Sequence, residues 1–158
     1  MSHLKSLFSR QSGQSLVELA VTMPILTLLL LGGAELARLA FASIQVTNAA
    51  KAAVQYGDQN HAFASTDSNG MKIAATADAQ GLSGLNVTSY RQYQCSNAPG
   101  VMLAVDSNDN PSNTSCTGST LEEILTVTTT AVFDPLIHLP GLPTTYTLTG
   151  NATQVVLQ

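Results

Sequence analysis

The stretch SGQSLVELAVTMPILTLLLLGGAELARLAF, residues 12–41, decides the fold. Between Glu18 and Glu35 it contains no charged side chain, and Leu, Ile, Val, Met, Ala or Gly fill nearly every position. A stretch with so few polar residues forms either a buried core helix or a helix that crosses a bilayer. Length separates the two, because a crossing takes roughly 20 residues at about 1.5 Å each. The run from Leu16 to just beyond Gly33 is long enough, so we predict a transmembrane helix.

The charges on the two sides of this helix predict its orientation. Lys5 and Arg10 precede it with no acid among them, whereas eight acids and only three basic residues follow Phe41. By the positive-inside rule, the N-terminus stays in the cytoplasm and the rest of the chain lies beyond the membrane.

Glu18 is a carboxylate inside the apolar stretch. An ionised group costs up to about 3 kcal/mol near the bilayer centre, and such a residue is usually kept for function. Its local setting is specific, because a short basic leader ends at Gly13, four residues follow, and the apolar run begins beside the glutamate.

This arrangement resembles a type IV prepilin signal, in which a membrane peptidase cuts after the glycine and leaves a glutamate at the fifth mature position. The resemblance implies cleavage between Gly13 and Gln14. Residues 12–56 also resemble the TadE-like pseudopilins of tight-adherence pilus systems. That likeness is carried by Gln14, Val17, Glu18, Pro24, the Leu run, Glu35, Arg38 and Asn48-Ala49-Ala50. The chain departs from the family at Lys51 and Gln55, where arginine is expected.

The resemblance implies partners and a location. The partners are a prepilin peptidase, other pilins or pseudopilins, the inner-membrane pilus assembly platform and membrane lipid. The location is the bacterial inner membrane, crossed once, with the C-terminal domain in the periplasm. Major subunits of these systems are expected to be much shorter, so the extra domain favours a minor role.

Two charged sites follow from this segment. After cleavage the new α-amino group of Gln14 would lie one helical turn from Glu18, so we predict that Glu18 docks on an amine of its own or a neighbouring subunit. The alternative is a solvated Glu18 at the headgroup level, where a helix N-terminus favours its charge. Glu35 and Arg38 have i, i+3 spacing and are expected to pair at the helix surface.

The helix is expected to start at Gln14, to kink at Pro24 and to run to about Tyr56, since Gly57 is the next stop signal. Beyond the membrane it reads as an amphipathic helix. Its predicted apolar stripe consists of Leu36, Ala40, Ser43, Thr47, Ala50 and Val54.

The remaining chain predicts one short helix and a small sheet. A turn at 67–70 is expected to cap a helix over 71–80 that docks on the first helix. Alternating and β-branched residues predict four strands, over 85–94, 101–105, 121–133 and 145–157, with the second as the hairpin partner of the first. The fold class is therefore α+β and pilin-like, with a long N-terminal helix packed with a second short helix on an antiparallel sheet. The expected divisions are a leader (1–13), a transmembrane and amphipathic helix (14–56) and an extracytoplasmic domain (57–158).

Composition argues against most chemistry. The 158 residues are only 10% charged, with a net charge of −4 and no basic patch, so nucleic-acid binding is not expected. Cys95 and Cys116 lie on the non-cytoplasmic side, where a disulfide is the default for a pair. The three histidines, His3, His61 and His138, join no catalytic motif. We predict no enzyme activity, cofactor or metal.

Three functions remain open. The first is a minor pilin or pseudopilin, trimmed after Gly13, that takes part in assembling a tight-adherence (Flp-type) pilus. The second is an uncleaved, membrane-anchored envelope adhesion or binding protein outside any filament. The third is a secreted protein cut after Ala42, because Ala40-Phe41-Ala42 meets the small-residue rule of signal peptidase.

Overall fold

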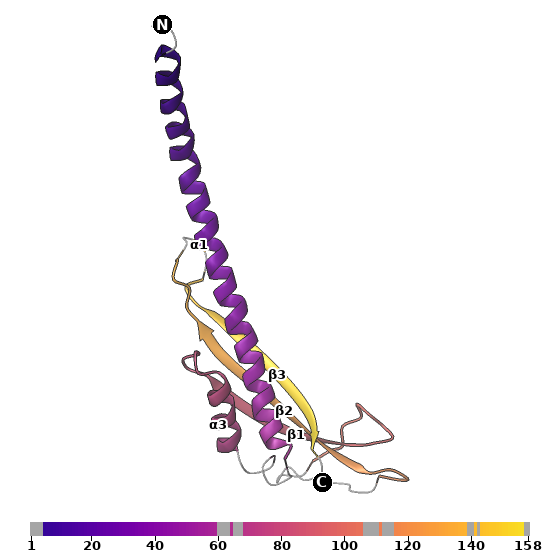
Figure 1. Cartoon of the computed structure of the whole chain (residues 1–158). Coiled ribbons are helices and arrows are strands. Elements are labelled where there is room, and N and C mark those ends of the chain that lie inside the picture. Colours follow the sequence, from indigo (N-terminus) through magenta and orange to yellow (C-terminus); the bar gives the residue numbers. More distant parts are fainter. Residues whose placement is uncertain are drawn as a thin grey trace. The chain divides into compact units, whose positions relative to one another are not determined.

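The computed structural model describes residues 5–59, 64, 68–105, 111, 116–138, 141 and 143–156, with side chains from residue 13 onward. The chain divides into two compact units, Met1–Arg38 and Leu39–Gln158. The predicted α+β class is confirmed (Figure 1). The elements are helices α1 (Lys5–Gly57) and α3 (Ser68–Asp78) and strands β1 (Asn86–Cys95), β2 (Leu121–Phe133) and β3 (Tyr146–Val156).

Helix α1 begins earlier than predicted. It starts at Lys5 and passes through Gly13 without a break, whereas the sequence was expected to become helical only at Gln14. Gly13 costs a helix only about 1 kcal/mol relative to alanine, and no proline interrupts the first turns, so the leader can join the helix. Pro24 also lies inside α1. The leader boundary after Gly13 therefore stays a prediction about processing.

The sheet has the order β1-β2-β3, and both pairs are antiparallel (Figure 1). The longest strand, β2, has the bounds predicted from its β-branched residues. Its odd-numbered side chains from Glu123 to Phe133 are all buried, as the predicted alternation requires. This face forms the core of the second unit with the apolar sides of the helices. The core residues include Ala49, Ala53, Val54, Met71, Ala75, Leu125 and Val127.

The predicted hairpin of 85–94 with 101–105 is wrong in its main part. Strand β1 pairs with β2 over ten residues, from Asn86 opposite Thr130 to Cys95 opposite Leu121. The segment 101–105 makes only short contacts with the other edge of β1, where the Leu103 amide donates to the Tyr93 carbonyl at 2.7 Å. The long β-branched strand offers β1 a full ladder, and the short segment cannot match it.

The sheet-facing side of α1 also differs from the predicted stripe. Leu36, Ala40 and Ser43 are exposed, and of the stripe only Ala50 and Val54 are buried. The buried face instead consists of Ala42, Val46, Ala49, Ala50, Ala53 and Val54.

Two sheet residues select this face of the helix. Thr129, fully buried on β2, donates its hydroxyl to the Val46 carbonyl at 2.7 Å. A Cβ atom added to Gly150 on β3 would lie only 2.6 Å from the same carbonyl oxygen and 2.8 Å from the Thr47 Cα. The helix backbone therefore lies directly on β3, and only a residue without a side chain fits there.

Helix α3 begins at Ser68, so Ser68, Asn69 and Gly70 form its first turn and not the predicted capping turn before Met71. Asp67, the first residue of that turn, lies outside the described residues. The helix buries Met71 and Ala75. A Cβ atom added to Gly57 would lie 3.1 Å from the Met71 sulfur, so α3 packs near the end of α1 as well as beside β1.

Candidate processing and docking site

The first unit exposes a continuous apolar surface along α1. Every large apolar side chain from Leu16 to Leu31 is more than half exposed, from 51% at Leu26 to 74% at Leu30. Soluble monomers rarely leave so large an apolar area in water. Within the described residues, α1 is the helix that is long and apolar enough to cross a membrane. It is therefore a candidate membrane anchor.

Gly13 and Gln14 lie at the start of this surface. Gly13 is exposed, and a Cβ atom added to it would meet nothing within 4 Å. The helix therefore gives no packing reason for a glycine here, unlike at Gly150. The side chain of Gln14 is exposed as well and lies one helical turn before Glu18.

Glu18 presents an exposed carboxylate at the start of the apolar run. Its backbone carbonyl accepts a 2.9 Å hydrogen bond from the Thr22 hydroxyl, which adds to the helical bonding of this turn. None of the ion pairs among the described side chains includes Glu18. Its charge is thus available to a group from outside the folded chain or to the amine that cleavage would create.

Glu35 and Arg38 lie at the other end of the apolar run. One guanidinium nitrogen of Arg38 lies 3.0 Å from both carboxylate oxygens of Glu35. The Glu35 side chain is only 18% exposed, whereas that of Arg38 is 45% exposed. The pair neutralises two charges at the point where the apolar run ends. Counted along the helix, Glu18 and Glu35 are about 25 Å apart, close to the thickness of a bilayer core of about 30 Å.

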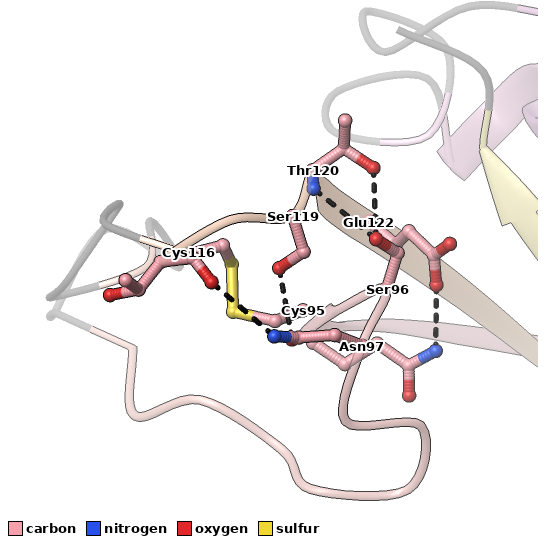
Figure 2. Close-up of a disulfide and its surroundings, with 9 residues drawn as sticks. Cys95, Ser96, Asn97, Cys116, Ser119, Thr120 and Glu122 are labelled. Atoms are coloured by element: carbon pink, nitrogen blue, oxygen red, sulfur yellow. Dashed lines mark hydrogen bonds between the residues drawn. A yellow bond between two sulfur atoms is a disulfide. The ribbon is translucent and has the colours of Figure 1, made fainter.

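In the second unit, Cys95 and Cys116 form a disulfide with Cα atoms 5.5 Å apart (Figure 2). Polar contacts continue the β1–β2 pairing around it: the Ser96 amide donates to the Thr120 carbonyl, and the Ser119 hydroxyl donates to the Asn97 side chain at 2.9 Å. The bridge spans a separation of 21 residues. In the chain-entropy model, a loop of that size stabilises the fold by about 3 kcal/mol.

The second unit contains a buried ion pair that the sequence did not predict. Glu123 is fully buried on the helix-facing side of β2, 3.4 Å from the Arg91 guanidinium, which also donates to the Tyr93 hydroxyl at 2.8 Å. The burial of Glu123 could have been predicted from the sequence, because residues two apart in a strand face the same side and Leu125 is a predicted core residue. Its ion-pair partner on β1, Arg91, could not, since the sequence does not give the register of the two strands. We interpret the pair as structural.

The other titratable contact described in the second unit involves a histidine. His138 lies in the connection after β2 and contacts Asp134, with 3.3 Å between the imidazole nitrogen and the carboxylate oxygen. Within the part of the chain that the structure describes, no group of three or more His, Cys, Asp or Glu side chains could hold a metal ion. His3 and His61 lie outside the described residues.

Comparison with known proteins adds one finding. The family model described as TadE-like protein matches residues 13–55. This match confirms the predicted resemblance, and it begins at the proposed cleavage glycine and ends two residues before α1 does. Neither the curated proteins nor the solved structures gave a match.

Proposed function

We propose that the chain is a minor pilin or pseudopilin that takes part in assembling a tight-adherence pilus. The observation that carries this proposal is that the TadE-like match, residues 13–55, coincides with the helix that exposes a continuous apolar surface. An apolar helix of this kind can lie in lipid before assembly and against other helices after it. The compact α+β unit then remains outside the hydrocarbon core of the membrane.

The proposed topology follows from charge and chemistry. Lys5 and Arg10 stay in the cytoplasm, the apolar run crosses the inner membrane, and the second unit lies in the periplasm. The Cys95–Cys116 disulfide supports an oxidising compartment for that unit. A prepilin peptidase removes residues 1–13, and the processed subunit then meets other pilins or pseudopilins and the assembly platform.

Within this proposal Glu18 is the docking group. Cleavage after Gly13 creates an α-amino group on Gln14, one turn from Glu18, and a neighbouring subunit presents the same amine. A carboxylate in surroundings of low dielectric is costly without a cation, so contact with an amine favours association. It also sets the axial position of one subunit against the next. If Gln14 cyclises, the amine is lost and only hydrogen bonding holds Glu18.

We expect Glu18→Ala to insert into the membrane and to lose its leader normally, but to lose most of its association with the other pilus components. The apolar run and Gly13 are unchanged, so insertion and cleavage keep their determinants. Co-purification from membranes, scored separately from insertion and from leader removal, measures the effect.

The matched control is Glu35→Ala, which removes the second carboxylate of the helix. It breaks an i, i+3 pair with Arg38 worth only about 0.5 kcal/mol, so association should persist. If Glu18→Ala associates as well as the unmodified chain, Glu18 is not the docking group. In that case the uncleaved envelope anchor becomes the better account.

A further inference from the structure

One end of the second unit carries exposed apolar side chains outside the apolar run of the membrane helix. On α1, Phe41 and Ile44 are 63% and 58% exposed. In the connection between β2 and β3, Leu136 is 75% and Ile137 is 38% exposed. We call these four residues the apolar end.

The packing of α1 on the sheet places both parts at the same end of the unit. Gly57 contacts Leu125, whereas the Val46 carbonyl accepts the Thr129 hydroxyl. The later residue of α1 thus lies beside the earlier residue of β2, so the two elements run in opposite directions. Residues 134–138, which follow Phe133 directly, thus lie at the end of the sheet where this unit's part of α1 begins (Figure 1).

The short distance along α1 between the apolar run and Phe41 indicates that lipid covers this end. Phe41 comes three residues after Arg38, about 4.5 Å along the helix axis, and Ile44 comes one turn further. The headgroup layer on each side of a bilayer core is about 5–7 Å thick, and aromatic side chains favour this layer. If α1 crosses the membrane as proposed, the apolar end is the part of the folded unit nearest to the outer leaflet.

The titratable side chains of residues 134–138 are Asp134 and His138. Asp134 lies in the same connection as Leu136, and its carboxylate contacts His138. We infer that the apolar end, Phe41, Ile44, Leu136 and Ile137, inserts into the headgroup layer of the outer leaflet and holds the second unit against the membrane. This inference rests on the membrane-spanning role proposed above.

The absence of tryptophan from the chain makes the test direct. Single-tryptophan variants of the full chain, Phe41→Trp and Leu136→Trp, are reconstituted in vesicles of phosphatidylcholine and phosphatidylglycerol. Some vesicles carry lipid brominated near the headgroup end of the acyl chain, and bromine quenches nearby tryptophan. We expect both variants to emit at shorter wavelength than in water and to be quenched several-fold more than the control.

The matched control is Val101→Trp. Val101 is an exposed apolar residue, 62% exposed, beyond the other end of β1, so tryptophan has the same intrinsic preference for lipid there. Leu26→Trp, within the apolar run, reports insertion itself through deeply brominated lipid. A circular dichroism spectrum that matches that of the unmodified chain shows that each variant has folded.

The outcomes distinguish the lipid contact of the apolar end from the membrane-spanning role of α1. Quenching of Leu26→Trp together with an unquenched Leu136→Trp would overturn the apolar end as a lipid contact and leave the membrane helix standing. A blue-shifted but unquenched Leu136→Trp would also overturn it, because a protein surface would then cover the residue. If Leu26→Trp is not quenched either, the membrane-spanning role itself fails.

Discussion

Replacing Gly150 with valine is expected to destabilise the second unit by about 3 kcal/mol or more, near the upper end of overpacking effects. The added Cβ would lie 2.6 Å from the Val46 carbonyl oxygen and 2.8 Å from backbone atoms of Thr47. Both neighbours are main-chain atoms of α1, so no side chain can rotate away. Small domains are stable by only about 5–15 kcal/mol, so this is a large share.

The midpoint of urea unfolding of the full chain in detergent, followed by circular dichroism, measures this effect. Asn151→Val is the control, since it places the same side chain on the next residue of β3, where the native side chain is exposed on the opposite face. The change removes only the exposed hydrogen bond that the Thr128 hydroxyl donates to the Asn151 side chain at 2.7 Å, so its midpoint should stay far closer to that of the unmodified chain than the midpoint of Gly150→Val. Equal midpoints for Gly150→Val and the unmodified chain would show that α1 does not lie directly on β3.

The second large effect concerns processing. Gly13→Val is expected to remain uncut while it still inserts, because a peptidase active site must approach the backbone closely at the junction and a branched side chain blocks that approach. The substitution leaves the folded chain intact, since an added Cβ meets nothing within 4 Å. Intact mass of the protein extracted from membranes distinguishes the cut from the uncut form.

Gly33→Val serves as the matched control for that variant. Gly33 also lies in α1 with nothing within 4 Å of an added Cβ, so it receives the same change at a site far from the junction. Its leader should be removed normally. Leader loss from Gly13→Val, or an uncut Gly33→Val, would remove the basis for assigning Gly13 to the cleavage site.

The apolar run and strand β2 could be predicted from the sequence because each has a strong local pattern. The unbroken apolar stretch after Glu18 admits only a helix in lipid or in a core, and the β-branched run of 121–133 alternates cleanly. The face of α1 that meets the sheet could not be predicted in the same way. Small residues lie on all sides of this helix, so its face is selected by distant partners, the hydroxyl of Thr129 and the missing side chain of Gly150.

The strand that pairs with β1 could not be predicted from the sequence either. Local alternation marks 101–105 as strand-like, but β1 pairs with the strand that offers the longer matching ladder, and that strand, β2, begins only at Leu121. The polar residues also differ in whether the sequence can predict their contacts. Gly13, Gln14 and Glu18 lie close together in the sequence, so a processing and docking site can be predicted from it, whereas the buried contact of Glu123 with Arg91 depends on a register between strands.

The N-terminus of the mature protein tests the central claim most directly. Intact mass and N-terminal sequencing of the chain from the membranes of cells with an active prepilin peptidase locate it in a single measurement. The proposed function predicts a chain that begins at Gln14, with or without cyclisation of that glutamine. A chain that begins at Met1 or Ser2, or at Ser43, would contradict it in favour of the uncleaved anchor or the secreted protein, respectively.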